Sequence, residues 1–234
     1  MAIPLRYLVV RAVLATSLSL ALRLQAEPLP ALELRFTVFA PSQLTGLAYV
    51  AESTPTQKIV PVVFYPTARS PVYVYRGAAP LQFVDLQSKT VVAIAEIPLE
   101  MHQPLLIFFP HSPSPGSGLR YEVYVHDDAP TRHTAGGLAI LNFSGMEITG
   151  KIGRQVVELQ RGFSGPYQVG KSVRVSFRIH IDNVAYQAYA DTIRMGPDGR
   201  ALLVLLPPFY KGSYEAQSRV LLDEPVQKPE KTKG

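Results

Sequence analysis

Apolar and polar residues alternate with a period of two along much of the chain. The segment SVRVSFRIHI at 172–181 is the clearest case, with Val173 and Val175 on one side of an extended strand and Arg174 and Arg178 on the other. Three further runs are rich in β-branched and aromatic residues: 33–40, 71–77 and 119–127. Outside the N-terminal segment, no long stretch keeps a 3.6-residue apolar period. The pattern therefore predicts an all-β protein with a sandwich or barrel fold.

Part of this pattern occurs twice, most visibly as LLIFFP at 105–110 and LLVLLP at 202–207. Each segment is followed by a turn containing Gly and Ser, and then by a Tyr-Glu pair that opens another strand. Two further matches follow the same order: GLAYV at 46–50 with GLAIL at 137–141, and VYVYRG at 72–77 with VELQRG at 157–162. Four ordered matches predict two tandem copies of one sandwich, in which the Leu-Leu segments are the same buried strand.

The repetition places one sandwich domain at 32–129 and a second at 136–225, joined by a short segment rich in small residues. Each would hold about seven antiparallel strands, the number in an immunoglobulin-like sandwich. The chain has no Cys and no Trp, so the Cys-Trp-Cys core of antibody domains is absent and the likeness is one of architecture. The strand at 119–127 also resembles 34–39, so it could close the first domain or open the second.

The first 26 residues have the layout of a secretory signal peptide. Arg6 and Arg11 lie in or beside a charged region, 12–22 is apolar, and Ala26 supplies a small residue at the expected cleavage position. An uncleaved membrane anchor is the alternative, but the apolar run is shorter than the roughly 20 residues that a membrane span needs. We therefore expect a secreted or periplasmic mature chain without a membrane span.

The charge distribution argues against a nucleic-acid partner. The formal net charge is +5, but residues 27–225 hold 17 basic and 17 acidic residues, because the excess lies in the signal segment and in the tail at 226–234. We expect that basic tail to be disordered. A nucleic-acid-binding domain carries a basic stripe, which this balance does not suggest. Because there is no cysteine, apolar burial must stabilise the fold, and thiol catalysis is excluded.

Candidate catalytic chemistry is sparse. His126, Asp127, Asp128 and His133 are residue types that bind zinc or another divalent ion, and they lie near a strand end. However, adjacent aspartates before Ala-Pro are common turn formers, so we predict neither a metal nor another cofactor. No nucleophile elbow, P-loop, zinc-protease or dinucleotide motif occurs. We therefore predict no catalytic activity, with a hydrolase or its accessory domain as the alternative that would use these four residues.

A difference between the repeated segments suggests a binding surface. In VYVYRG the side chains of Tyr73 and Tyr75 share a face, where the aligned VELQRG carries Glu158 and Gln160. If the copies align, the first domain exposes two tyrosines at a position that is polar in the second. Such a pair suits a sugar ring, a peptide or a protein partner. Packing on the other domain, or cross-strand tyrosine pairing, is the structural alternative.

The connection PPFYKGS at 207–213 adds two aromatic side chains, Phe209 and Tyr210, which we expect to be exposed. Together these features predict a secreted or periplasmic, non-catalytic binding or structural module that engages a protein or a polymer of the cell envelope. A chaperone-like assembly factor that binds clients at strand edges is an alternative.

Overall fold

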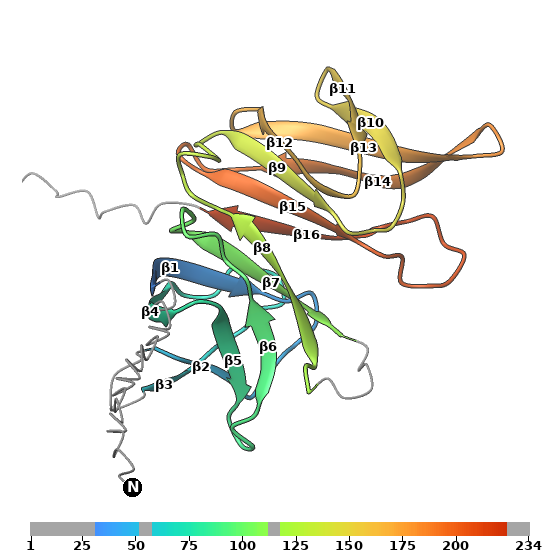
Figure 1. Ribbon diagram of the computed structural model, residues 1–234. Coiled ribbons are helices and arrows are strands. Elements are labelled where there is room, and N and C mark those ends of the chain that lie inside the picture. The colour runs from blue at the N-terminus through green and yellow to red at the C-terminus, as the bar shows by residue number, and fades with distance from the viewer. Residues whose placement is uncertain (1–30, 52–57, 112–117, 224–234) are drawn as a thin grey trace, which may run out of the picture.

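The computed structural model describes residues 31–51, 58–111 and 118–223, and this part of the chain contains strands and no helix (Figure 1). The predicted signal peptide and basic tail lie outside the described residues. The strands form four sheets of four strands each, and the sheets come in two pairs. Each pair encloses an apolar core, so the protein consists of two tandem β-sandwich domains, as the sequence predicts.

Both domains contain eight described strands rather than about seven. The strands of the first domain are β1 (Ala31–Phe39), β2 (Leu47–Val50), β3 (Ile59–Pro61), β4 (Tyr73–Ala78), β5 (Leu81–Asp85), β6 (Val91–Ala95), β7 (Pro104–Pro110) and β8 (Tyr121–Asp127). Those of the second domain are β9 (Gly137–Asn142), β10 (Ile148–Ile152), β11 (Gln155–Leu159), β12 (Gly162–Gln168), β13 (Ser172–Ile181), β14 (Val184–Arg194), β15 (Arg200–Leu206) and β16 (Gln217–Asp223).

The two domains repeat one topology strand for strand. Sheet β4-β1-β7-β8 of the first domain corresponds to β12-β9-β15-β16 of the second, and β3-β2-β5-β6 corresponds to β11-β10-β13-β14. In both domains the first strand runs parallel to the seventh, β1 to β7 and β9 to β15. LLIFFP forms β7 and LLVLLP forms β15, so the prediction that these segments are equivalent strands is confirmed.

Two of the four sequence matches are wrong. GLAYV lies on β2, whereas GLAIL lies on β9, whose counterpart is β1. VYVYRG lies on β4, whose counterpart is β12, whereas most of VELQRG lies on β11. Short strands share the same alternation and the same β-branched residues, so a match of five or six residues does not fix the alignment of two sheets.

The strand whose place was ambiguous closes the first domain. β8 pairs antiparallel with β7 along its whole length, from Pro104 opposite Asp127 to Pro110 opposite Tyr121. The residue before β8, Arg120, also contacts the other sheet of the same domain. Its backbone amide donates a hydrogen bond to the carbonyl oxygen of Val92 on β6, 2.8 Å away.

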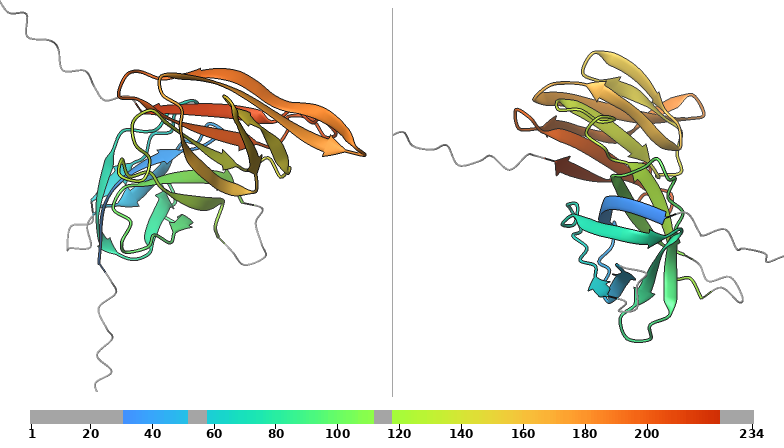
Figure 2. Two further views of the ribbon diagram at one scale, coloured as in Figure 1. Left: turned by 90° about the horizontal axis from the view of Figure 1, so that it is seen from above. Right: turned by 60° about the vertical axis from the view of Figure 1, so that its left-hand side comes forward.

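β7 and β15 are apolar on both faces because each contributes to two cores. In β7, Leu106 and Phe108 point into the core of the first domain, whereas Leu105 and Ile107 point into a cluster between the domains. The β15 side chains divide in the same way between the second core and this cluster. The inner sheets β4-β1-β7-β8 and β12-β9-β15-β16 therefore pack on each other, with the remaining two sheets on the outside (Figures 1 and 2). A strand buried on both faces loses the polar alternation of the others.

Candidate functional site

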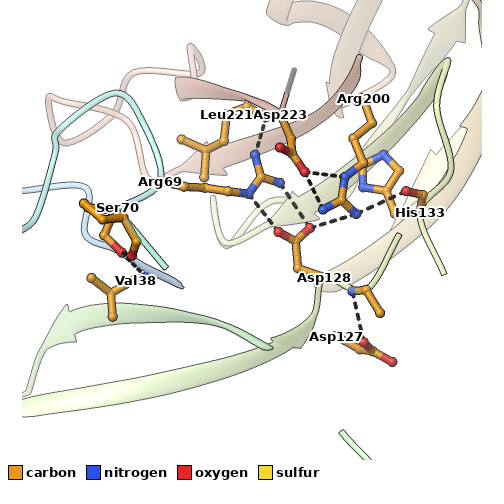
Figure 3. A network of polar contacts seen from close by, with 11 residues as sticks. Val38, Arg69, Ser70, Asp127, Asp128, His133, Arg200, Leu221 and Asp223 are labelled. Carbon is orange, nitrogen blue, oxygen red and sulfur yellow. Dashed lines mark hydrogen bonds and ion pairs between the residues drawn. The ribbon is translucent and has the colours of Figure 1, made fainter. Parts of the chain in front are cut away.

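A network of buried ion pairs lies beside the apolar contact between the domains (Figure 3). Arg69, between β3 and β4, donates Nε and Nη2 to the two carboxylate oxygens of Asp128, at 2.8 and 3.1 Å. Its Nη1 donates to the carbonyl oxygen of Leu221 on β16, 2.9 Å away. The side chains of Arg69 and Asp128 are only 9% and 7% exposed. One guanidinium group thus links the end of β8 to a strand of the second domain.

Arg200 extends this network within the second domain. It starts β15 directly opposite Asp223 at the end of β16, and its Nε and Nη2 lie 2.8 and 2.6 Å from Asp223 Oδ2. Its Nη1 donates to the carbonyl oxygen of His133 at 3.1 Å and lies 3.6 Å from Asp128 Oδ1. Asp128 therefore lies between two arginines, and its carboxylate neutralises charge that both bring into the interface.

The two adjacent aspartates have structural partners. Asp127 accepts a hydrogen bond from the amide of Ala129 at 3.2 Å and lies 3.5 Å from the Nε of Arg132, which is the turn chemistry that the sequence indicates. Asp128 is engaged by the arginines. Among the residues that the structure describes, no three His, Cys, Asp or Glu side chains are grouped so as to hold a metal ion.

Two buried histidines lie at the same junction. The ring of His126 on β8 lies 5.1 Å from the ring of Phe163 on β12, and His133 Nε2 lies 3.0 Å from the carbonyl oxygen of Gly137. His126 Nε2 and His133 Nδ1 are buried without a hydrogen-bond partner among the described residues. Burial lowers the pKa of His126 from 6.5 to about 4 and also lowers the pKa of His133, so both rings are neutral at pH 7.

The stability of the protein should therefore fall as the pH falls from about 6.5 to about 4. In this window His126 takes up a proton in the unfolded chain but not in the folded one, so acid favours unfolding, by up to about 3 kcal/mol from this group. Urea unfolding followed by circular dichroism at several pH values measures the slope. We expect His126→Phe, which keeps a ring beside Phe163, to reduce the slope, and the exposed-site variant His180→Gln to keep it. A wild-type stability that is flat over this window would contradict the prediction.

A cavity of about 510 Å³ opens beside the network, between the two domains. Its polar wall includes Arg69, Arg200, Asp128 and Asp223, whose charged groups already bond one another or backbone carbonyls. The cavity therefore lies at the structural contact between the domains, and the buried Arg69, Asp128 and Arg200 have few bonding positions left for a ligand. Arg35, which is exposed, also lines it.

The expectation that Tyr73 and Tyr75 form an exposed platform is wrong. Tyr75 is 6% exposed, belongs to the core of the first domain and donates its hydroxyl to the carbonyl oxygen of Ala78 at 2.7 Å. Tyr73 is half-buried against the same core. The exposed apolar side chains of this segment are Val72 and Val74. The error came from comparing this strand with VELQRG on β11, which is not its counterpart.

Phe209 and Tyr210 are exposed, as the sequence predicts, at 73% and 71%. Their rings lie 4.9 Å apart in an edge-to-face arrangement. The structure adds a second exposed pair that sequence reasoning missed, in which Tyr214 packs against Tyr186 of β14 with ring centroids 4.6 Å apart. We call residues 207–216, between β15 and β16, the aromatic loop. Tyr214 could have been found from its closeness in sequence, but Tyr186 is brought there by the fold.

Both ends of the aromatic loop are held by hydrogen bonds. The side-chain amide of Gln217 donates to the carbonyl oxygen of Pro207 at 2.8 Å, and the amide of Ala216 donates to the carbonyl oxygen of Ala188 on β14 at 2.9 Å. Within the loop, the amide of Ser213 donates to the carbonyl oxygen of Tyr210 at 3.1 Å. The loop therefore presents its aromatic side chains from a defined backbone, which lowers the entropy cost of binding.

Two edge strands are protected against the addition of a further strand. On β4, the carbonyl oxygen of Val74 accepts a hydrogen bond from the hydroxyl of Tyr49 at 3.0 Å. On β12, the pairing with β9 is interrupted between Ser164 and Tyr167, and Pro166 in this interval has no amide hydrogen to donate. Such features block edge-to-edge pairing in native sheets.

No protein-family model matches this chain, and no curated protein is similar to it in sequence. In the described part of the chain, no helix is long and apolar enough to cross a membrane.

Proposed function

We propose that this protein is an exported, non-catalytic binding module that contacts a protein or a polymer of the cell envelope through the aromatic loop. The observation that carries the proposal is the exposure of Phe209 and Tyr210 on a loop whose ends are hydrogen-bonded. Isolated exposed apolar side chains are common on proteins. Phe209 and Tyr210 are two adjacent exposed rings, and Tyr214 of the same loop packs on Tyr186. Phe and Tyr are residue types enriched in protein interfaces.

A pull-down tests this proposal. The bait is residues 27–234, incubated with culture medium and a detergent-solubilised envelope extract of the source cells, and captured partners are identified and then rebound in purified form. We expect Phe209→Ser/Tyr210→Ser to lose the partner. The matched control is Tyr65→Ser/Leu99→Ser, which removes two exposed apolar side chains from the first domain and should bind like the wild type. Equal capture by all three proteins would remove the aromatic loop from the proposal, and no capture by the wild type would overturn it.

The alternatives receive less support from the geometry. An assembly factor that adds a client strand needs an open edge, and two of the eight described edge strands, β4 and β12, carry blocking groups. A hydrolase that uses Asp128 needs that carboxylate free to act on a substrate, but both its oxygens lie within hydrogen-bonding distance of Arg69. Neither alternative has an observation of its own in its favour.

A further inference from the structure

The outer sheet of the second domain, β11-β10-β13-β14, is labelled in Figure 1. Its solvent face carries a concentration of positively charged residues. On β13, Val173, Val175 and Phe177 point into the core, so Arg174 and Arg178 point outward. Each of the two strands paired with β13 places one further cation on the same face. Lys151 of β10 is opposite Ser176, and Arg194 of β14 is opposite Ser172, both of which face outward. We call Lys151, Arg174, Arg178 and Arg194 the basic face.

The basic face is exposed, and no described residue neutralises its charges. All four side chains are exposed, and none forms an ion pair or a side-chain hydrogen bond with another residue of the described part of the chain. Among the outward positions of these four strands only Glu158, on the edge strand β11, is acidic. This sheet lies on the far side of the second domain from the first, so no other sheet in the described part of the chain covers it (Figure 2).

We propose that the basic face binds an acidic polysaccharide, a polymer whose sugars carry carboxylate, sulfate or phosphate groups. The proposal deepens the proposed function, since it names an envelope polymer as a partner, but it uses a different surface from the aromatic loop. Unpaired cations that are held at fixed positions on a rigid sheet attract a polyanion by charge complementarity and by release of its counterions.

The geometry of the face favours an extended polyanion. Arg174 and Arg178 are four residues apart on one strand, about 13 Å, and Lys151 lies on the adjacent strand, about 5 Å to the side and between them along the strand. A linear chain with regularly spaced anions can contact these cations in succession. The cavity that borders this face, of about 570 Å³, is lined by Thr149 and Glu158 near the β11 edge and by none of the four cations, so it does not gather them around a small anion.

Other charged partners need features that the face lacks. Single-stranded nucleic acid is held by stacking on aromatic side chains, and the outward positions of these strands carry no Phe, Tyr or Trp, with His180 as the one aromatic ring there. The centre of a protein–protein interface is apolar and excludes water. On this face the large exposed apolar side chain is Val156, which lies at the β11 edge and not at the centre. A lipid surface is bound most firmly when apolar groups insert beside the cations. A hydrated acidic polysaccharide requires only the cations and the polar groups between them.

The test measures binding of the full mature chain, residues 27–234, to alginate, whose sugars carry carboxylates. Neutral dextran, single-stranded DNA and vesicles of anionic phospholipid are compared in the same buffer. We expect alginate to be bound best and dextran not at all. If all four cations displace counterions, the affinity for alginate should fall on the order of 100-fold between about 50 and 200 mM salt.

Arg174→Gln/Arg178→Gln removes two of the four cations. It should lower alginate affinity roughly tenfold or more and reduce the salt dependence to about tenfold over the same range. Lys58→Gln/Lys89→Gln, which removes two exposed cations from the first domain, has the same net charge and should bind like the wild type. Circular dichroism confirms that each variant is folded.

Equal binding by both double variants would overturn the proposal, as would stronger binding of DNA, vesicles or dextran than of alginate. The aromatic-loop variant Phe209→Ser/Tyr210→Ser should keep its affinity for alginate. If alginate does not bind but the pull-down partner still depends on Phe209 and Tyr210, the basic-face proposal fails while the proposed function stands. If alginate binds through the basic face and the pull-down captures nothing, the aromatic loop fails instead.

Discussion

Replacing Asp128 by Ala should destabilise the protein by about 3–5 kcal/mol, because a buried charge network then loses its shared carboxylate. Arg69 would keep only its hydrogen bond to the carbonyl oxygen of Leu221, and its charge would remain in the interface without a counter-charge. Arg200 would retain Asp223 but lose the nearby charge of Asp128. Urea unfolding followed by circular dichroism gives the free energy directly. Dichroism suits this chain because it contains no Trp for fluorescence.

Two comparisons make this result specific. Glu33→Ala removes one partner of the Glu33–Arg76 ion pair, whose side chains are mostly exposed, and should change stability by less than about 1 kcal/mol. Arg69→Met combined with Asp128→Leu removes both charges and should recover much of the loss caused by Asp128→Ala. A cost below about 1 kcal/mol for Asp128→Ala would show that the arginines are solvated in solution and that the network does not join the domains.

Leu105→Ala should destabilise the protein by about 2–5 kcal/mol, which is the range for a leucine removed from a protein core. Leu105 is fully buried, but its side chain lies in the cluster between the domains rather than in the core of either sandwich. The next residue, Leu106, is equally buried and points into the core of the first domain. The two substitutions should therefore have effects of similar size on urea unfolding.

The pair of variants tests whether the domains form one body in solution. If they move independently, Leu105 is exposed in much of the population, and Leu105→Ala costs far less than Leu106→Ala. Leu99→Ala serves as the exposed control, since this side chain of the first domain is 53% exposed, and should change stability by within about 0.5 kcal/mol. Similar large effects at 105 and 106, together with one cooperative transition, are the outcome that the packing of β7 against the second domain predicts.

Sequence reasoning succeeded where the signal was local. The two-residue alternation at 172–181 correctly predicted strand β13. The exposure of Phe209 and Tyr210 followed from their position after two prolines in a connection between strands. It failed where a comparison between distant segments was needed. The prediction that Tyr73 and Tyr75 are exposed rests on aligning VYVYRG with VELQRG, and only the strand order shows that β4 corresponds to β12.

The count of charged residues also did not reveal a surface that is built from segments distant in the sequence. Equal numbers of basic and acidic residues between 27 and 225 suggest no basic surface, yet the basic face takes Lys151, Arg174, Arg178 and Arg194 from three strands. Composition adds the charges of the whole chain, whereas a partner meets the charges of one surface. The partners of Asp128 were hidden in a similar way, because Arg69 and Arg200 are far from it along the chain.

The sequence by itself determined that the protein is all β, that it repeats one sandwich and that β7 and β15 are equivalent, since these features follow from alternation and from runs of apolar residues. Tertiary structure decided the rest: the packing of the inner sheets, the arginine–aspartate network, the pairing of Tyr186 with Tyr214 and the basic face. Each depends on the register of paired strands or on contacts between domains. A shift of one residue in register would turn these side chains to the opposite face.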